Sequence, residues 1–407
     1  MNKTQFFKLG WRGVKRSIEW LFYWIFDSAI LASQRPMPNA NITAIVHIKL
    51  LGDYALWWPY ALDLVQFLQN KKQDVVLVIN KAFLPLVASH FPDCRIIGID
   101  CRGFTRNLLM RARSLRELRQ LSVGCVYHTA YPRDALIEDA SVRALAAPAW
   151  GFDVVFTDRP WFDRAVSRRL YSELLPPMPA VHQTARYQAL HLAIGVPGFD
   201  GAATGDFSVN SVLDVPASYF VVVPGASHAG KRWPVERFAQ IATKILRTNP
   251  HWRCVILGTE KERHLGEILR NLIEGNVDNR AGQTTLSDFV RWISQAQLVV
   301  GNDSAACHIA GACGVKSVAV VGGGHYGWFF PYDASEARVK CLPITVSEPM
   351  ACFGCDWVCR YSVGPSQPYP CIASVETEQM WNAVEAAVAS LSRASSNVPG
   401  ASLRAGI

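Results

Sequence analysis

The stretch LVVGNDSAACHIAGACGVKSVAVVGG, residues 298–323, decides the fold of the second half of the chain. Two runs rich in valine flank a segment rich in alanine and cysteine, which is typical of a strand, a helix and a second strand. Units of this kind, repeated along a chain, build a parallel sheet that is covered by helices. We therefore predict an α/β domain here.

The same alternation of strands and helices extends toward the N-terminus. The further apolar runs expected to be strands are residues 42–50, 74–80, 94–100, 122–128, 219–225 and 252–258. Residues 201–216 contain few long apolar runs and are the expected connection between the halves. The pattern predicts two parallel-sheet α/β domains that face each other.

These patterns divide the chain into four segments. Residues 1–38 are expected to form an amphipathic helix and a linker, and residues 39–205 a first α/β domain. Residues 206–390 form a second domain with a cysteine-rich loop at 350–372, and residues 391–407 a flexible tail.

Composition narrows the class of protein. Half of the residues are hydrophobic and 18% are charged, which is typical of a globular chain. The 41 Lys and Arg exceed the 33 Asp and Glu by 8, which suits an anionic small molecule or a membrane surface but is too weak to indicate a nucleic-acid partner. The 11 cysteines favour a reducing cytoplasm over a secreted disulfide scaffold.

The N-terminal segment has the pattern of an interfacial helix and not of a membrane span. Its longest apolar stretch, Trp20 to Ala32, is interrupted by Asp27 and is shorter than the ~20 residues that a spanning helix needs. The residues that recur at helical spacing are Trp11, Val14, Ile18, Leu21, Phe22, Ile25 and Ala29. Because cations precede this stretch, we expect it either to lie on the inner face of the cytoplasmic membrane or to pack on the protein's own surface.

The first strand leads into KLLGDYALWWP, residues 49–59, which lacks the G-x-G-x-x-G pattern of a nicotinamide-binding turn. No Walker A motif is present either. Asp53 instead follows Gly52 at the carboxyl end of a strand, where open α/β sheets bind ligands. Asp53 is either a functional carboxylate or the N-cap of a helix in which Pro59 occupies the first turn.

The second half offers sites for an anion. The run VVVPGASHAGKRWP places Lys231 after a strand and just before a helix. Asp303 and Ser304 stand at the start of another helix, where free N–H groups and the helix dipole bind phosphate. His308 either leans toward the same anion or is a satisfied core residue. With the glycine run Gly322 to His325, these features indicate a diphosphate-bearing ligand.

At this point the chain resembles glycosyltransferase family 9, the bacterial heptosyltransferases, from about Ile42 to Glu385. The motifs that carry the resemblance are IVHIKLLGDYALWWPYALDLV, VPGASHAGKRWPVERFAQIA, ILGTEKER and the opening stretch at 298–323. The resemblance implies the GT-B fold, with two Rossmann-like domains and a cleft between an acceptor side and a nucleotide-sugar side. It also implies an inverting transfer, without a metal or other cofactor, from a nucleotide sugar to a lipopolysaccharide core or related glycan.

The resemblance implies roles for individual residues. Asp53 corresponds to the general base that deprotonates the acceptor hydroxyl, and Lys231 to the cation that neutralises the leaving diphosphate. The residues expected to bind the donor are Ser227, Lys231, Glu260, Asp303, Ser304, Ala305 and His308. Ala305 stands where many members have glycine, and the loop GGGHYGWFFPY also departs from the family's form. Both departures bear on the identity of the sugar and not on the reaction type.

The implied partners are a nucleotide sugar, usually ADP-heptose, and an anionic glycolipid or glycan acceptor. Another nucleotide sugar, a protein acceptor and a non-catalytic nucleotide-binding scaffold remain as alternatives. The arginines between Arg102 and Arg119 form either a solvated helix face or a docking surface for a phosphorylated acceptor. They include Arg106, Arg111, Arg113, Arg116 and Arg119.

Four cysteines cluster near the C-terminus, in CFGCDWVCRYSVGPSQPYPC. Cys352, Cys355, Cys359 and Cys371 lie in one Gly- and Pro-rich loop and could complete a tetrahedral site for a structural Zn or, by the resemblance, Fe. The alternatives are two disulfides, which a cytoplasm disfavours, or four small buried hydrophobes. We expect such a metal to be structural and far from the transfer chemistry.

Overall fold

The computed structural model of the chain describes residues 3–32, 36–153, 161–179, 181–197, 205–207, 209, 214–334 and 337–396. Within these ranges, the side chains of 3–16, 161–164 and 392–396 are not described. The chain divides into two compact units, Met1–Gly201 and Ala202–Ile407. Most of the expected connection at 201–216 and residues 397–407 of the expected tail lie outside the described residues.

Unit 1 is built on a six-stranded parallel sheet with the order β3-β2-β1-β4-β5-β6. Its strands are β1 (Asn39–His47), β2 (Asp74–Asn80), β3 (Arg95–Ile99), β4 (Val123–His128), β5 (Ala149–Phe152) and β6 (Glu173–Leu175). The apolar run around Val46 forms β1 at the centre, where Val46 is paired with Val78 on one side and His128 on the other. Buried strands of this kind are near-continuous apolar runs because helices cover both faces.

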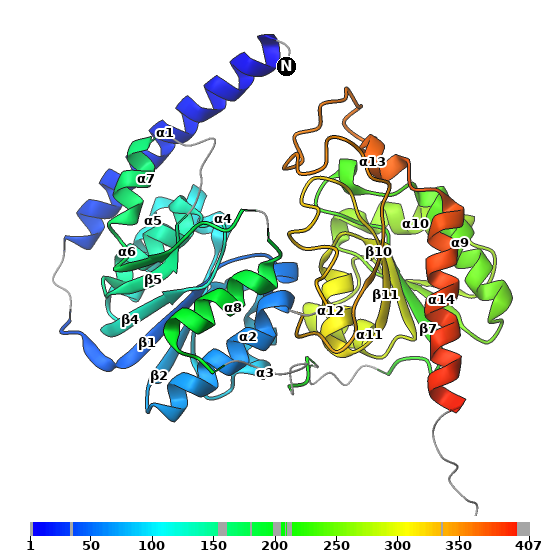
Figure 1. Ribbon diagram of the computed structural model, residues 1–407, viewed down its shortest axis with the longest axis horizontal. Coiled ribbons are helices and arrows are strands. Elements are labelled where there is room, and N and C mark those ends of the chain that lie inside the picture. Colours follow the sequence, from blue (N-terminus) through cyan, green and yellow to red (C-terminus); the bar gives the residue numbers. More distant parts are fainter. Residues whose placement is uncertain are drawn as a thin grey trace, which may run out of the picture. The chain divides into compact units, whose positions relative to one another are not determined.

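The helices of unit 1 cover both faces of this sheet (Figure 1). They are α1 (Lys3–Leu31), α2 (Leu51–Asn70), α3 (Leu84–His90), α4 (Cys101–Arg106), α5 (Leu108–Arg119), α6 (Ala140–Leu145), α7 (Trp161–Arg168) and α8 (Gln183–Ile194), with short turns η1 (Lys81–Phe83) and η2 (Ala135–Asp139). The helix expected to start near Pro59 begins at Leu51, so Pro59 lies inside α2. The prediction of its start was therefore wrong, because Pro59 was taken as a first-turn residue.

Unit 2 repeats the plan, with a six-stranded parallel sheet in the order β12-β11-β10-β7-β8-β9. Its strands are β7 (Tyr219–Val223), β8 (Arg253–Ile256), β9 (Val277–Asn279), β10 (Leu298–Asn302), β11 (Lys316–Val320) and β12 (Ile344–Val346). Its helices are α9 (Val235–Thr248), α10 (Arg263–Leu272), α11 (Leu286–Ser294), α12 (Ala305–Cys313), α13 (Pro370–Ala373) and α14 (Thr377–Ser396), with turns η3 (Ala229–Lys231) and η4 (Glu260–Glu262). The expectation of two parallel-sheet α/β domains is confirmed.

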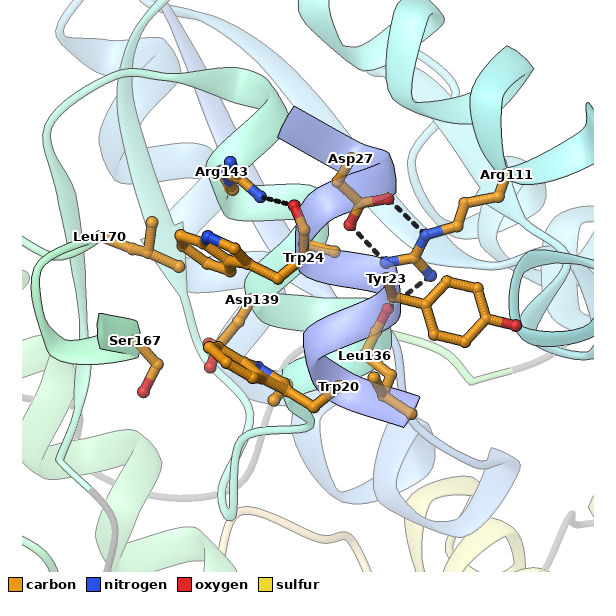
Figure 2. A pocket seen from close by; sticks show the side chains of 12 residues that line it. Trp20, Tyr23, Trp24, Asp27, Arg111, Leu136, Asp139, Arg143, Ser167 and Leu170 are labelled. Carbon is orange, nitrogen blue, oxygen red and sulfur yellow. Dashed lines mark hydrogen bonds and ion pairs between the residues drawn. The ribbon is translucent and has the colours of Figure 1, made fainter. Parts of the chain in front are cut away.

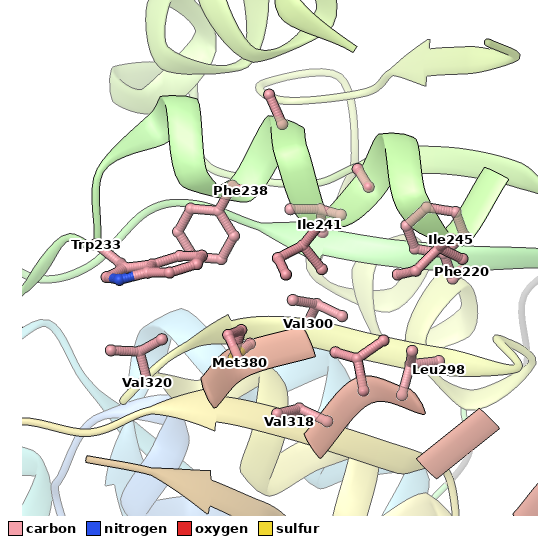
Figure 3. Packing of buried hydrophobic residues seen from close by; sticks show 14 of the residues in the cluster. Phe220, Trp233, Phe238, Ile241, Ile245, Leu298, Val300, Val318, Val320 and Met380 are labelled. Carbon is pink, nitrogen blue, oxygen red and sulfur yellow. The ribbon is translucent and has the colours of Figure 1, made fainter. Parts of the chain in front are cut away.

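The core of unit 2 shows why the opening stretch folds as it does. Leu298 and Val300 of β10 point to the same face as Val318 and Val320 of β11, as alternate residues of a strand must. They pack there against side chains of α9 and α14, including Met380 (Figure 3). α14 continues to Ser396, so residues 391–396, which were expected in the flexible tail, are helical.

Candidate active site

Each sheet has one topological switch point, and the predicted site residues follow the strands on its two sides. The strand order reverses at the neighbours β1 and β4 in unit 1, and at β7 and β10 in unit 2. Ligands of open α/β sheets bind outside the carboxyl ends of the strands at such a point. Asp53 follows β1, Lys231 follows β7 and Asp303 follows β10, so each lies at the switch point of its own unit.

Asp53 stands in the first turn of α2 and is half-buried. The N-cap of this helix is Leu50, and no side chain caps it. The alternative that Asp53 is the N-cap of this helix is therefore wrong. Its carboxylate accepts hydrogen bonds from the backbone N–H groups of Leu50 and of Asp53 itself, at the end of β1.

A buried charge network lies beside Asp53. Lys49 donates to Glu138 at 3.0 Å and to the carbonyl oxygen of Pro132 at 2.7 Å. Glu138 is fully buried, accepts the backbone N–H of Asp134 at 2.7 Å, and has Nε2 of His128 at 3.5 Å from its carboxylate. The negative charge of Glu138 is thus balanced inside the unit, as a buried carboxylate requires.

This network sets the protonation of the groups around it. Burial raises the pKa of Asp53 to about 6; the charge of Lys49 opposes this rise and that of Glu138 adds to it. Burial alone would raise the pKa of Glu138, but Lys49 and His128 outweigh it and hold that pKa at about 2. Burial also disfavours a charged Lys49, yet Glu138 raises the pKa of this amine above its ordinary value. Near neutral pH the pair stays ionised, while Asp53 is poised to gain or lose a proton.

His47, the last residue of β1, is a poor competitor for the role of base. Its ring stacks on Trp57 with centroids 4.2 Å apart, and its Nδ1 lies 3.0 Å from the hydroxyl of Thr129. Burial lowers the pKa of His47 to about 3, so the ring is neutral and a weak proton acceptor at pH 7. Asp53 is the better base of the two.

In unit 2 the structure brings two of the predicted residues together. Nζ of Lys231 lies 3.2 Å from Oδ2 of Asp303, and both side chains are nearly nine-tenths buried. The pair joins the loop after β7 to the loop after β10. A cation and a carboxylate therefore stand together at the switch point of unit 2.

Asn302, which the sequence analysis did not single out, holds these two loops in place. Its fully buried side chain accepts the backbone N–H of Trp233 at 2.9 Å and donates to the carbonyl oxygens of Pro224 and Gly225. It thus fixes the loop after β7 to the end of β10. An amide between an apolar strand and an acidic residue, in VVGND, was the available signal.

The start of α12 has features that could bind an anion. Its N-cap is Ser304, whose side chain does not cap the helix. Oγ of Ser304 is buried and has no hydrogen-bond partner among the residues that the structure describes. Ala305 opens the helix, so the first N–H groups and this hydroxyl lie next to Asp303.

His308 lies one turn further along α12 and is almost fully buried. Its Nδ1 is 2.7 Å from the hydroxyl of Tyr332, and its ring stacks on Phe330 with centroids 4.2 Å apart. The loop after β11 therefore packs on His308. These contacts give the side chain the packing of a core residue and orient its ring.

The remaining donor-site candidates stand apart from this pair. Ser227 is exposed in the loop after β7. Glu260 is exposed and forms an ion pair with Arg263 at 2.6 Å. It is Glu262 that faces the loop after β7, because a Cβ added to Gly225 would meet its carboxylate.

The glycine run at 322–324 packs against the cysteine-rich loop. A Cβ on Gly324 would lie 2.2 Å from the ring of Trp357, and one on Gly323 would lie 2.2 Å from the ring of Phe353. The backbone N–H groups of Gly354 and Asp356 donate to the carbonyl oxygens of this run. The glycines thus let the cysteine-rich loop pack on them.

The cysteine-rich loop reaches the candidate site itself. Nζ of Lys231 lies over the ring of Trp357, 4.3 Å from its centre. Asp356 and Trp357 have φ angles of 49° and 59°, in the left-handed region that favours glycine. The cysteine-rich loop therefore contacts Lys231, one of the residues predicted to bind the donor.

The four clustered cysteines line one pocket together with aromatic residues of the loop. They are Cys352, Cys355, Cys359 and Cys371, and all four are free of disulfides. Across the described part of the chain, no three Cys, His, Asp or Glu side chains are arranged to hold a metal ion. The disulfide alternative is wrong, and the sulfurs as placed do not fit a tetrahedral metal site.

Comparison with known proteins concerns mainly unit 2. Residues 183–348 match the family described as glycosyltransferase family 9 (heptosyltransferase). Asp53 lies outside this match. Lipooligosaccharide heptosyltransferase 2 of Haemophilus influenzae is 31% identical over 104 residues, which are 24% of this chain and 30% of that protein. Lipopolysaccharide core heptosyltransferase OpsX of the same organism is 23% identical over 65% of this chain and 74% of its own length.

Solved structures extend the likeness of fold to both units. A glycosyltransferase family 9 protein from Veillonella parvula matches with a TM-score of 0.66 and 16% identity, over 88% of this chain and 100% of that one. The E. coli heptosyltransferase WaaC, solved with ADP-2-deoxy-2-fluoro heptose, matches with a TM-score of 0.58 and 16% identity, over 86% and 99%. The iron-containing dodecameric glycosyltransferase TibC of enterotoxigenic E. coli matches with a TM-score of 0.50 and 13% identity, over 88% and 77%.

These likenesses agree with the residues at the two switch points. The fold is that of the two-domain GT-B heptosyltransferases. The family match spans the loops of unit 2 that carry Lys231 and Asp303. Residues 183–348 thus resemble glycosyltransferase family 9, the heptosyltransferase family, and both units share the fold of solved heptosyltransferases.

Proposed function

We propose that the chain is an inverting glycosyltransferase that moves heptose from ADP-heptose to a lipopolysaccharide core or a related cell-surface glycan, on the cytoplasmic side of the membrane. The observation that carries the proposal is the Lys231–Asp303 pair beside the start of α12, within the region that matches the family. The nucleotide sugar follows from WaaC, which was solved with an ADP-heptose analogue. The acceptor follows from OpsX, a lipopolysaccharide core enzyme by name.

Unit 2 contributes the charge that the leaving group needs. When the bond between the anomeric carbon and the diphosphate oxygen breaks, the electron pair stays with ADP. Lys231 is a fixed cation, and the N-terminus of α12 adds N–H groups and the Oγ of Ser304. Donors aimed at charge that develops in the transition state give the largest share of many rate enhancements.

Unit 1 contributes the base. The acceptor hydroxyl attacks the anomeric carbon from the face opposite the diphosphate, which inverts the configuration, and its proton passes to Asp53. A carboxylate with a pKa of about 6 suits this step, since it is ionised at pH 7 and is more basic than an ordinary aspartate. Lys49 and Glu138 keep this pKa in that range.

A panel of nucleotide sugars tests the proposal directly. With each nucleotide sugar, the melting temperature of the protein and the slow hydrolysis of the sugar are measured for the full chain and for Lys231→Ala. Lys261→Ala changes an exposed lysine and is the matched control. We expect ADP-heptose alone to raise the melting temperature, and Lys231→Ala alone to lose this shift. A rise in melting temperature with a different nucleotide sugar would show that this other sugar is the donor. A rise without any hydrolysis or transfer would favour a non-catalytic binding scaffold.

The acceptor needs its own assay. With ADP-heptose as donor, transfer to a heptose-deficient lipopolysaccharide core is compared with transfer to proteins of the same cell extract. We expect the product to be glycolipid. Label that appears only in protein would show that the acceptor was assigned wrongly while the donor stands.

A structural metal at the cysteine cluster remains a separate proposal that no step of the transfer uses. It is supported by the four cysteines that line one pocket, whose side chains, in the described part of the chain, are not arranged around one ion. Elemental analysis of the purified chain decides it. About one Zn or Fe per chain, lost in the Cys352→Ser/Cys355→Ser double variant, would establish the site, and four titratable thiols without metal would end it.

A further inference from the structure

The N-terminal helix α1 has two different long faces, and only one of them packs on unit 1. Trp20, Tyr23, Asp27 and Leu31 are each less than a tenth exposed. Their spacing of three and four residues places them on one side of the helix. The apolar stripe identified in the sequence lies on the other side.

Polar contacts hold the packed face and fix which side of α1 faces unit 1. Arg111 of α5 donates from Nε and Nη2 to the two carboxylate oxygens of Asp27, at 2.6 and 2.5 Å, and both residues are buried (Figure 2). Arg143 donates to the carbonyl oxygen of Trp24 and to Ser28. A bidentate buried ion pair costs several kcal/mol to break, so it fixes which side faces outward.

Two of the arginines that could have bound a phosphorylated acceptor are therefore engaged in the fold. Arg111 holds Asp27, and Arg119 donates to the carbonyl oxygen of Leu31 at 3.2 Å. The other members of this group, Arg102, Arg106, Arg113 and Arg116, are exposed on α4 and α5. α1 contacts both of these helices, α4 through Tyr23 and α5 through Asp27.

The outward face of α1 is apolar. Ile18, Leu21, Phe22 and Ile25 are between 49% and 66% exposed, and they follow the i, i+3, i+4, i+7 spacing of one helix face. Two consecutive turns thus present four large apolar side chains to solvent. A run of such residues on a soluble protein marks a surface that something covers.

The charge around this face identifies what covers it. In the sequence, five cations precede this face along the chain: Lys3, Lys8, Arg12, Lys15 and Arg16. No acidic residue precedes Glu19 in the chain. Apolar residues flanked by cations match the acyl boundary and headgroups of an anionic bilayer.

We propose that the outward face of α1 docks in the plane of an anionic lipid bilayer, with Ile18, Leu21, Phe22 and Ile25 inserted and the arginines of α4 and α5 against the headgroups. No helix among the described residues has the length and apolarity to cross a bilayer, so the contact is with its surface. The buried Asp27–Arg111 pair attaches α1 to the rest of unit 1. The enzyme is thereby held where a glycolipid acceptor is found, but the docking itself does not rest on the proposed transfer.

The test is flotation with vesicles of phosphatidylcholine alone or mixed equally with phosphatidylglycerol. Phe22→Ser/Ile25→Ser is compared with the full chain and with Leu192→Ser, an exposed leucine of α8 that serves as control. We expect binding to the anionic vesicles only, falling as salt rises, roughly tenfold or more weaker in the double variant and unchanged in the control. Arg113→Glu/Arg116→Glu should weaken binding and flatten its salt dependence.

These substitutions leave the buried pair intact, whereas removal of residues 1–38 would leave the charge of Arg111 buried and unpaired. Melting temperatures of all variants verify folding. Equal vesicle binding by the double variant and the full chain would overturn the proposal. So would a full chain that binds no vesicle and sediments as a dimer that the double variant dissociates, because the face would then be a contact between two copies. Loss of transfer activity with vesicle binding retained would contradict only the proposed function.

Discussion

The two switch points place charged groups in different surroundings. In unit 1, Asp53 lies beside the buried Lys49–Glu138 pair and its pKa is raised to about 6. In unit 2, Lys231 lies between the carboxylate of Asp303 and the ring of Trp357, both of which favour a cation. The site of unit 1 is thus suited to proton transfer, and the site of unit 2 to a fixed positive charge. Parallel sheets of the same strand order can therefore carry opposite chemical duties through the loops alone.

The largest effect is expected from a substitution of Asp53. Asp53→Asn removes the proton acceptor but keeps the size and most of the hydrogen bonding of the side chain. We expect turnover to fall by ~10²–10⁴, the range for loss of a general base, while ADP-heptose binding changes little. Single-turnover transfer and donor titration measure the two effects. Turnover near that of the unchanged protein, in a folded variant, would remove Asp53 from the reaction.

Lys231→Ala should affect binding as well as rate. The ammonium meets the diphosphate before the reaction and the added charge of ADP after it, so both Kd for ADP and kcat are expected to worsen. We expect kcat/KM to fall by about 10- to 1,000-fold, since a buried charge-assisted contact is lost and Asp303 is left unpaired. Isothermal titration with ADP and steady-state kinetics check this. ADP affinity equal to that of Lys261→Ala would place Lys231 outside the donor site.

The pH dependence sharpens the difference between the units. In the proposed mechanism transfer requires ionised Asp53, so kcat/KM should fall as pH drops through about 6. Glu138→Gln removes a negative charge that raises this pKa, and the acid limb should move to lower pH. Lys49→Met removes the cation that lowers it, and the limb should move to higher pH. If the acid limb of the kcat/KM profile stays at the same pH in both variants, a group other than Asp53 controls it.

Stability gives an independent reading of the same network. The pKa of Glu138 is lowered from 4.5 to about 2, so its ionised form contributes stability above pH 4.5 that is lost as pH falls toward 2. Thermal unfolding followed across this range should show a smaller loss for Glu138→Gln than for the unchanged protein. This outcome concerns folding alone, and it therefore holds whatever the substrate is.

The sequence was sufficient for the parts of the site that are local in the chain. The alternation of apolar runs and helices predicted both sheets, and strand ends pointed to Asp53, Lys231 and Asp303. It missed Glu138, which reaches Lys49 from a turn 89 residues away, because no local pattern marks a buried long-range partner. It did not show that the glycines at 322–324 pack against aromatic rings, since a glycine required by a ligand and one required by an aromatic ring look alike in sequence.

The N-terminal helix shows a second limit of sequence patterns. The apolar stripe was predicted with its residues, but not the opposite face that holds the helix to unit 1. That face contains Tyr23 and Asp27, whose partners Thr105 and Arg111 lie more than 80 residues away. The sequence analysis therefore treated an interfacial helix and a packed helix as alternatives. In the structure one face of α1 packs on unit 1, and the opposite face is exposed.

The smallest expected effect is that of Trp357, and it tests whether the cysteine-rich loop belongs to the donor site. Its ring covers Nζ of Lys231 at 4.3 Å, and the loop is tied to the turn before Lys231 by the hydrogen bond from Tyr369 to Gly230. A cation–π contact contributes about 0.5–2 kcal/mol, so Trp357→Leu should weaken ADP binding by about 3- to 30-fold and raise KM for the donor more than it lowers kcat. Trp357→Phe keeps a ring and should restore most of the affinity, which a purely structural role would not predict. Tyr361→Leu, an exposed aromatic of the same loop, is the matched control. If Trp357→Leu and Tyr361→Leu bind ADP alike, Trp357 packs the loop without positioning Lys231.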